Sequence, residues 1–427
     1  RSAILIKFYK YLTVEGGSIV SKHFSIKKLS LTALCLLPIN ALAGGIWLNE
    51  YGDPSQGRAS AGSAAGTDDA STAIHSIASM TRLDSDQVMV TGGFIYSKVE
   101  FDVKSNGLLN GDGDGGNAGD TIPVGSAFYT RQVNDETWVG VSLAGWSGAG
   151  LDYHDNWAGR YQVTEVNIVA MALMPSIAYK VNDNLSVGFG LPIMYTELEM
   201  DISAPTAPGR PDNTGSLDGD DTVVAVNFSG LYEFTEQTRI GAYYNSKFDA
   251  DYDGGIKTTR GINASTETNL TLAEKIRVSM SHEFNDTTTG HLSWGWENWS
   301  DLGNVTISVE NGGAALPRKW EDTYHYAAGV THMLNQHWRI NAGIAYDTDP
   351  VDKEDRTADL PIDRQIRYAF GVEHIPTKGP SIAGSLVYAD YGSAPIQYDG
   401  LGDGGLTGFN GDYNSNDLVF FSLSANW

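Results

Sequence analysis

Cysteine is nearly absent from the 427-residue sequence, and the only one, Cys35, lies within an apolar run from Leu29 to Leu42. Lysines precede this run and Ala41-Leu42-Ala43 ends it, a pattern typical of a secretory signal peptide with its cleavage site. We expect cleavage to leave Gly44 as the mature N-terminus. The mature chain then has no disulfide, although secretion takes it to a compartment in which disulfides form.

Long apolar runs are also missing. The run of residues 29–42 is shorter than the roughly 20 residues that a transmembrane helix needs, so we expect it to be removed and not to anchor the chain. The sequence does not begin with Met. We therefore interpret residues 1–43 as a signal peptide with an upstream stretch that is an annotation artefact.

Positive charge is scarce. Residues 44–427 contain 22 Lys and Arg against 51 Asp and Glu, which argues against a nucleic-acid partner. The histidines lack zinc-ligand spacing, no Gly-x-Ser-x-Gly motif is present, and the Asp-rich stretch 110–120 lacks the distal Glu of an EF-hand. We therefore expect no metal, no cofactor and no catalytic residue.

What the sequence does contain is glycine and aromatic residues, with 49 Gly, 21 Tyr, 14 Phe and 10 Trp, in stretches that alternate in polarity. In DLVFFSLSANW, Val419, Phe421 and Leu423 fall on one face, and Ser422 and Ser424 fall on the other. HWRINAGIAYD and NLSVGFGLPIMYTELEM repeat the pattern. These runs reach the roughly 9–11 residues of a membrane-spanning strand, whereas strands of a soluble β-sandwich usually have about 5–6.

Strands in hydrocarbon must close into a barrel, because an open edge would leave backbone groups unpaired. Short turns, such as residues 181–184 and 334–337, alternate with long polar segments, as periplasmic turns and exterior loops do. We predict an all-β fold, a transmembrane antiparallel β-barrel of about 14 strands over residues 86–427, in a bacterial outer membrane. The candidate strands begin near Asp86, Ile122, Glu136, Val163, Asn184, Asp221, Thr238, Leu272, Thr288, Trp320, His337, Arg364, Pro380 and Asp417.

Residues 44–85 have few large apolar side chains and no sustained helical or strand period, so they cannot fold by themselves. A segment of this size can be ordered inside a barrel, packed against the inner wall. We therefore predict that residues 44–85 form an N-terminal hatch, or plug, inside the lumen.

The stretch LNEYGDPSQGRASAGSAAGTDDASTA, followed by MTRL, resembles the N-terminal hatch of the long-chain fatty acid transporter family of Gram-negative outer membranes, which also includes aromatic hydrocarbon transporters. NWAGRYQVTEVNIVAMALMPSIAYKVNDNLSVGFG, WEDTYHYAAGVTHMLNQHWRINAGIAYDTDPVDKEDRTADLPIDRQIRYAFGVEH and the aromatic C-terminal strand agree with it in order. The resemblance implies a monomeric fourteen-stranded barrel with a hatch, which carries fatty acids or hydrocarbons without an enzymatic step. We expect it to contact outer-membrane lipid and lipopolysaccharide.

The fourth predicted strand is apolar on both faces, which suggests an apolar lumen. We expect Val169, Met171 and Leu173 to face inward, where they either contact the ligand or pack against the hatch. An apolar interior would favour apolar cargo, because each Å² of buried apolar area stabilises by roughly 25 cal/mol.

Three glycines, Gly145, Gly148 and Gly150, interrupt the third predicted strand, and glycine inside a strand often marks a bulge. The family has an inward kink there that opens a side window. The resemblance implies that these glycines form such a lateral opening, with Trp146 beside it as a ligand contact. The alternative is a flexible approach to the loop of residues 152–160.

Arg160 is the best candidate for a contact with a fatty acid carboxylate, because a guanidinium can grip a carboxylate with two hydrogen bonds. An internal ion pair with a carboxylate of the wall is the alternative role. Where the family usually has a basic residue in a Trp-Lys-Asp pattern, this chain has Glu321, which argues against a simple fatty acid as cargo.

The predicted hatch departs from the family pattern, because Ser76, Ile77 and Ala78 stand where relatives commonly have Asn-Pro-Ala. Residues from Gly44 to Trp47 either reach into the ligand pocket, as in relatives, or only tether the plug. The preferred function is transport of hydrophobic compounds. A general diffusion porin is the nearest alternative, and an outer-membrane phospholipase is the third.

Overall fold

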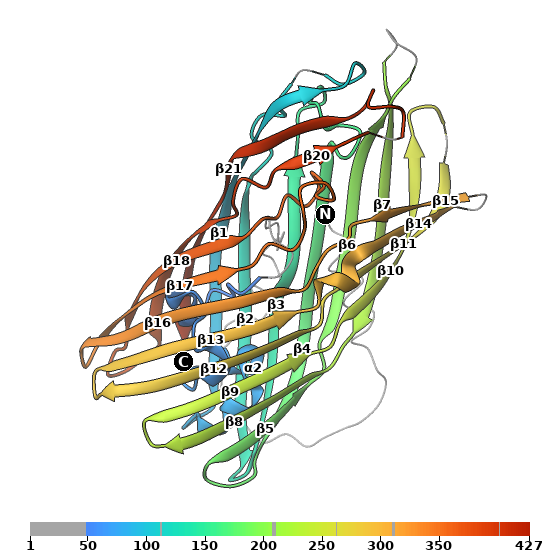
Figure 1. Ribbon diagram of the computed structural model, residues 1–427. Coiled ribbons are helices and arrows are strands. Elements are labelled where there is room, and N and C mark those ends of the chain that lie inside the picture. Colours follow the sequence, from blue (N-terminus) through green and yellow to red (C-terminus); the bar gives the residue numbers. More distant parts are fainter. Residues whose placement is uncertain (1–47, 112, 207–210, 262, 310–311, 401) are drawn as a thin grey trace, which may run out of the picture. The chain divides into compact units, whose positions relative to one another are not determined.

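The computed structural model describes residues 48–111, 113–206, 211–261, 263–309, 312–400 and 402–427 (Figure 1). The predicted signal peptide and the hatch residues Gly44 and Trp47 lie outside the described residues. Among those that are described, no helix is long and apolar enough to cross a membrane.

Antiparallel strands make up most of the described chain. The strands are β1 (Gln87–Asn106), β2 (Thr121–Asn134), β3 (Thr137–Asp152), β4 (Glu165–Lys180), β5 (Leu185–Gly190), β6 (Ile193–Ala204), β7 (Asn213–Val224), β8 (Asn227–Thr235), β9 (Thr238–Asn245), β10 (Phe248–Thr258), β11 (Asn263–Leu272), β12 (Lys275–Asn285), β13 (Thr288–Glu297), β14 (Asn304–Val309), β15 (Gly312–Pro317), β16 (Thr323–Asn335), β17 (Trp338–Asp347), β18 (Gln365–His374), β19 (Ser381–Asp390), β20 (Ile396–Tyr398) and β21 (Phe409–Asn426).

These strands form fourteen passes within the described residues, which confirms the predicted number. Eight passes are single strands, namely β1, β2, β3, β4, β17, β18, β19 and β21. Six passes each consist of two consecutive strands, namely β5 with β6, β7 with β8, β9 with β10, β11 with β12, β13 with β14, and β15 with β16. Because β1 pairs with β2 on one side and with β21 on the other, the sheet closes into a barrel.

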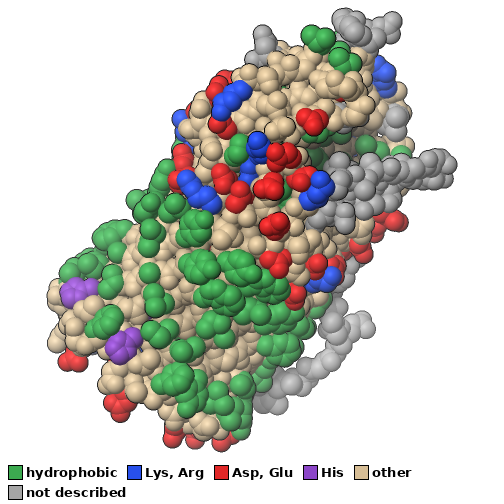
Figure 2. All heavy atoms as spheres, viewed as in Figure 1, with side chains coloured by type: hydrophobic (Ala, Val, Ile, Leu, Met, Phe, Trp, Pro, Cys, Tyr) green, Lys and Arg blue, Asp and Glu red, His purple; other side chains and the backbone are tan. Residues whose placement is uncertain are grey.

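The alternation of polarity places apolar side chains on the outer face, as predicted for the C-terminal strand. Leu423 is exposed, whereas Ser422 and Ser424 are buried. In β17, Ile344 and Tyr346 are exposed and Asn341 is buried. Figure 2 shows that hydrophobic side chains gather over one part of the barrel surface, with most of the acidic and basic side chains beyond it. This apolar band is the surface that faces lipid.

Four predicted strand starts, Asp221, Leu272, Trp320 and Asp417, lie too late in the chain. The passes that contain them begin at Asn213, Asn263, Gly312 and Phe409. The first residues of three of these passes, in β7, β11 and β21, are mostly polar, because the barrel wall continues beyond the apolar band into water. Strand geometry continues there through backbone pairing, while the alternation that identifies a membrane strand is lost.

Residues 48–83, here called the N-terminal segment, lie against the inner wall of the barrel. Backbone N–H groups of Gly62 and Ala78 donate hydrogen bonds to the inward hydroxyls of Ser293, at 2.9 Å, and Ser229, at 2.8 Å. At Gly57 a Cβ atom would come within 2.7 Å of a wall Cα, so this approach requires glycine. The segment contains only short helices, η2 (Pro54–Arg58), η3 (Ser63–Ala65), α2 (Thr72–His75) and η4 (Ile77–Arg82).

Candidate functional site

The barrel encloses a large apolar cluster, to which β4 contributes Val166, Ile168 and Ala170. Ser176 shows which face of β4 points inward. A Cβ at Gly140 of β3 would touch both Ser176 and Met80 of the N-terminal segment, so Ser176 lies on the side of the sheet that faces this segment. Side chains two residues apart share one face of a strand, so the even-numbered residues of β4 point inward. The interior next to β4 is therefore apolar.

The prediction that Val169, Met171 and Leu173 face inward is wrong. In the register of β4 with β6, Met171 lies opposite Tyr195 and Leu173 opposite Ile193. Directly opposed residues share a face of the sheet, and this face continues into exposed residues at the end of β4. These three side chains therefore lie on the outer face of the sheet, where Val169 is buried, and the even-numbered residues of β4 face the interior.

β3 departs from its neighbours near the predicted glycines. Its ladder with β2 ends at the pair Ala127 and Leu143, whereas its ladder with β4 continues to the end of the strand. The β3–β4 register shifts by one residue between Gly145 and Ser147, which makes Trp146 a bulge residue. Beyond Leu143, β3 therefore forms a strand ladder with β4 only.

Trp146 is buried in the apolar cluster, where its ring packs edge-on against Phe248 with the ring centroids 5.4 Å apart. The Nζ of Lys275 lies 5.9 Å from the centre of the Trp146 ring. Gly148 pairs with Val169 and Gly150 with Asn167 in the β3–β4 ladder. Gly145 thus directly precedes the bulge and Gly148 and Gly150 follow it, and all three lie on the part of β3 that has no ladder with β2.

Arg160 lies in the loop between β3 and β4, at a groove of about 660 Å³ that includes Leu108 and Leu109. Its Nε donates to Oδ2 of Asp212 at 2.8 Å, and its Nη2 donates to the carbonyl oxygen of Leu109 at 2.8 Å. The side chain is buried. Arg160 therefore forms an ion pair between two loops. Its acidic partner, Asp212, is a loop residue and not a residue of the barrel wall.

A buried ion pair joins the N-terminal segment to the wall. Oε1 of Glu50 lies 3.1 Å from Nε of Arg367 in β18, and Oε2 of Glu50 accepts a hydrogen bond from the backbone of Asn49 at 3.1 Å. Arg367 also donates from Nη2 to Gln365 at 2.6 Å and from Nη1 to Asp347. Burial raises the pKa of the Glu50 carboxyl, and the nearby Arg367 opposes this shift.

Further charges surround this pair. Asp347, at the end of β17, lies 2.7 Å from Nδ1 of His325 in β16. Nη2 of Arg277 lies 3.3 Å from Oε1 of Glu297, whose Oε2 accepts a hydrogen bond from the indole of Trp299 at 2.9 Å. We call the four residues Glu50, Arg367, Asp347 and His325 the Glu50 cluster.

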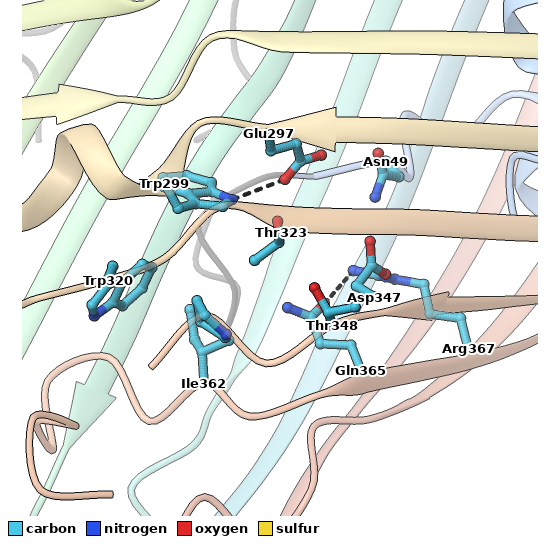
Figure 3. Close-up of a pocket in the computed structure, with 11 residues that line it drawn as sticks. Asn49, Glu297, Trp299, Trp320, Thr323, Asp347, Thr348, Ile362, Gln365 and Arg367 are labelled. Atoms are coloured by element: carbon cyan, nitrogen blue, oxygen red, sulfur yellow. Dashed lines mark hydrogen bonds and ion pairs between the residues drawn. The ribbon is translucent and has the colours of Figure 1, made fainter. Parts of the chain in front are cut away.

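A cavity of about 30 Å³ lies beside the Glu50 cluster, with room for about two water molecules (Figure 3). Trp299, Trp320 and Ile362 form one side of it, and Asp347 and Arg367 lie on the other. The cavity thus has an apolar wall and a charged wall. Its lining residues are Asn49, Glu297, Trp299, Trp320, Thr323, Asp347, Thr348, Pro350, Ile362, Gln365 and Arg367.

The residues of the predicted hatch motif lie near the other end of the N-terminal segment. Ile77 is fully buried, and a Cβ at Gly190 of the wall would touch its side chain. Ser76 accepts a hydrogen bond from Ser79 at 2.9 Å. With the Ala78 contact described above, these residues pack directly on the wall.

The sequence analysis did not identify Glu50, His325, Asp347 or Arg367. For the three residues of the wall, the signal is a charged or titratable residue at an inward position of a strand, as in QIRYAFGV, where Arg367 shares a face with small Ala369. Among the described residues, no three His, Cys, Asp or Glu side chains are grouped as a metal site.

A closed antiparallel barrel with an apolar outer band and a folded N-terminal segment in its interior defines the class of outer-membrane β-barrels used for transport. The chain belongs to the family described as outer membrane protein transport protein (OMPP1/FadL/TodX), whose model matches residues 34–426. It is therefore a protein of the Gram-negative outer membrane and not an enzyme.

The chain is 23% identical to a long-chain fatty acid transport protein of Escherichia coli O6:H1, over 92% of this chain and 99% of that protein. It is 25% identical to outer membrane protein P1 of Haemophilus influenzae, over 85% of this chain and 89% of the relative. Among solved structures, a Pseudomonas aeruginosa FadL homologue superposes with a TM-score of 0.82 at 20% identity, covering 90% of this chain and 99% of the other. The Pseudomonas putida toluene transporter TodX gives 0.68 at 14% identity, covering 89% and 98%.

Proposed function

We propose that this protein carries hydrophobic compounds across the outer membrane, with long-chain fatty acids as its main cargo, although Glu321 stands where the family usually has a basic residue. The observation that carries the proposal is the interior of the barrel, where apolar side chains of β3, β4, β10 and β11 form one buried cluster. A diffusion porin has a polar, water-filled lumen instead. At roughly 25 cal/mol per Å², burial of an acyl chain against such a surface supplies several kcal/mol.

The relatives support the same cargo class. The relatives named above include long-chain fatty acid transport proteins and a toluene transporter, and their cargoes share an apolar body. The barrel is closed and its interior contains the N-terminal segment, so passage requires a movement of part of the wall or of the segment.

In the proposed route, residues 44–85 act as a hatch and the cargo leaves sideways between β2 and β3. Two observations support this route. The β2–β3 ladder ends at Leu143 while both strands continue, and the bulge at Trp146 turns β3 away from β2. The same proposal includes a monomeric barrel, whose polar wall beyond the apolar band contacts lipopolysaccharide.

Mass spectrometry of apolar compounds that co-purify with the protein tests the proposed cargo, followed by competition with fatty acids and aromatic hydrocarbons. We expect fatty acids to co-purify and to be displaced by added fatty acid. Steady ion conductance in planar bilayers, with no bound apolar compound, would support a diffusion porin instead. Hydrolysis of phospholipid by the purified protein would support a phospholipase.

A further inference from the structure

Arg367 contacts three side chains, but only two of them accept a hydrogen bond from it. Its Nη1 donates to Asp347 and its Nη2 donates to Gln365. Its Nε lies 3.1 Å from Oε1 of Glu50, but neither of these two atoms has a hydrogen-bond partner of good geometry within the described residues. The contact with Glu50 is therefore an ion pair without an aligned hydrogen bond, which is the weaker kind of carboxylate contact.

The charges around the cavity leave no place for an additional anion. Asp347, Glu297 and Glu50 are acidic, whereas Arg367, Arg277 and Lys275, the cross-strand partner of Glu297, are basic, and all six are buried. A further carboxylate would leave a net negative charge in a poorly solvated site. One carboxylate can enter only if another leaves.

Glu50 is the carboxylate that can leave. Asp347 and Glu297 end strands β17 and β13 and are fixed by backbone pairing in the barrel wall. Glu50 belongs to the N-terminal segment, which consists of short helices and turns and has no ladder with the wall in the described residues. A movement of this segment withdraws Glu50 without breaking a strand ladder of the barrel.

The cavity gives an incoming molecule a suitable surface. Trp299, Trp320 and Ile362 form its apolar side, and Arg367 lies at its polar side (Figure 3). An amphiphile with an apolar chain and one carboxylate matches this combination, with the chain against the tryptophans and the head group at the guanidinium. The present cavity holds only about two waters, so such a molecule must displace part of the N-terminal segment.

We propose that Arg367 binds the anionic head group of the cargo in exchange for the carboxylate of Glu50. The exchange conserves charge, because one carboxylate replaces another at the same guanidinium. It also detaches the beginning of the N-terminal segment from the wall, so binding of an anionic amphiphile loosens the segment and binding of a neutral one does not. This inference rests on the proposed function and narrows its cargo to anionic amphiphiles.

The test compares hexadecanoate with hexadecanol, which has the same chain and a neutral head group, on the purified full chain in non-ionic detergent. Affinities are measured by titration calorimetry at neutral pH. The variants are E50Q, which removes the competing charge, and E50Q/R367Q, which removes the guanidinium without leaving Glu50 unpaired. The matched control is D68N, because Asp68 is also an acid of the N-terminal segment that lies near a wall arginine, 3.5 Å from Arg339.

We expect the wild-type protein to prefer hexadecanoate over hexadecanol by about tenfold, the scale of one charge-assisted contact. E50Q should raise the affinity for hexadecanoate several-fold and leave hexadecanol unchanged. E50Q/R367Q should bind the two ligands equally, and D68N should behave as wild type. Hydrogen exchange of residues 48–58 should increase with hexadecanoate, but not with hexadecanol.

Two results would overturn the exchange while leaving transport of hydrophobic compounds in place. One is equal affinity of the wild-type protein for hexadecanoate and hexadecanol. The other is that E50Q and E50Q/R367Q both keep the wild-type ratio of these two affinities. Unchanged exchange of residues 48–58 with hexadecanoate bound would overturn the release of the segment. If neither ligand binds, the proposed function fails together with this inference.

Discussion

The backbone N–H of Leu48 donates a hydrogen bond to the carbonyl oxygen of Trp146, 3.2 Å away. Leu48 begins the described part of the N-terminal segment, and Trp146 is the bulge residue at which β3 has left β2. The contact connects the segment inside the barrel to the part of the wall where β3 has no ladder with β2. We therefore expect a movement of the segment to affect the gap between β2 and β3.

The part of β3 beyond the bulge gives the first prediction. We expect Gly148→Leu to reduce fatty acid uptake several-fold, because Gly148 is buried and a larger side chain there would obstruct the gap beside β2. Gly92→Leu in β1 is the control, since a Cβ at Gly92 meets nothing within 4 Å. Uptake is measured in cells, and barrel assembly by heat-modifiable mobility on gels. Equal uptake by both variants would argue against a lateral route.

The outer position of Leu173 gives the second prediction. Because residues 44–427 contain no cysteine, Leu173→Cys and Ala172→Cys each introduce a unique thiol. A fluorophore at Leu173→Cys should be quenched by brominated lipid, whereas the thiol of Ala172→Cys should resist labelling in the folded barrel. Leu173→Arg should destabilise the barrel by up to about 2–4 kcal/mol, the cost of an arginine at the bilayer midplane. Quenching from Ala172→Cys alone would reverse the assigned faces.

Asp69 gives a prediction about pH. Burial and the carboxylates of Asp53 and Asp68 raise the pKa of Asp69 to about 6. Asp69 therefore binds a proton more readily when the N-terminal segment is packed than when it is released. The stability that this proton binding contributes to the packed segment is full below about pH 4 and is lost as the pH rises through about 6. Nearby arginines lower the pKa of Asp68 to about 2, so Asp68 does not titrate in this window.

We accordingly expect the N-terminal segment to be about 1 kcal/mol more stable at about pH 5 than at about pH 7.5. Hydrogen exchange of residues 69–76, corrected for intrinsic rates, measures the difference. Asp69→Asn should abolish most of it, because the amide does not titrate. A pH dependence that survives this substitution would assign the effect to another group.

Arg160 gives a prediction about the loops. Arg160→Met should expose residues 108–109 and 211–212 to protease, because it removes the hydrogen bonds to Leu109 and Asp212. Loss of charged hydrogen bonds of this kind costs about 1.5–3 kcal/mol each. The affinity for hexadecanoate should stay near the wild-type value if Arg160 serves the ion pair. If Arg160→Met instead loses much of its affinity for hexadecanoate and its loops stay resistant to protease, Arg160 would be a contact of the fatty acid carboxylate.

The barrel itself was predictable because its cause is local. Alternation of side chains, as at Leu423 and Ser424, follows directly from strand geometry, and lipid on one face makes the alternation visible in the sequence. The number of passes follows from counting such runs. The prediction lost accuracy only where strands such as β7 and β11 extend into water, since polar residues on both faces carry no alternation.

The candidate site was less predictable, because Glu50 is remote in sequence from the other three residues. His325, Asp347 and Arg367 lie on the consecutive strands β16, β17 and β18, and Glu50 meets Arg367 only when the N-terminal segment packs inside the barrel. Met171 and Leu173 were assigned to the wrong face, since β4 is apolar on both faces and alternation cannot tell inside from outside there. The register with Tyr195 and Ile193 of β6 decides the question.

The sequence by itself determined a closed lipid-facing barrel, because hydrocarbon forces every backbone group into a strand ladder and every outward side chain to be apolar. Only the tertiary structure decided where β3 leaves β2 and which carboxylate of the N-terminal segment meets Arg367. Those features depend on strand register and on the packing of a Gly-, Ala- and Ser-rich segment against a curved wall. Neither the register nor this packing produces a periodic pattern in the sequence.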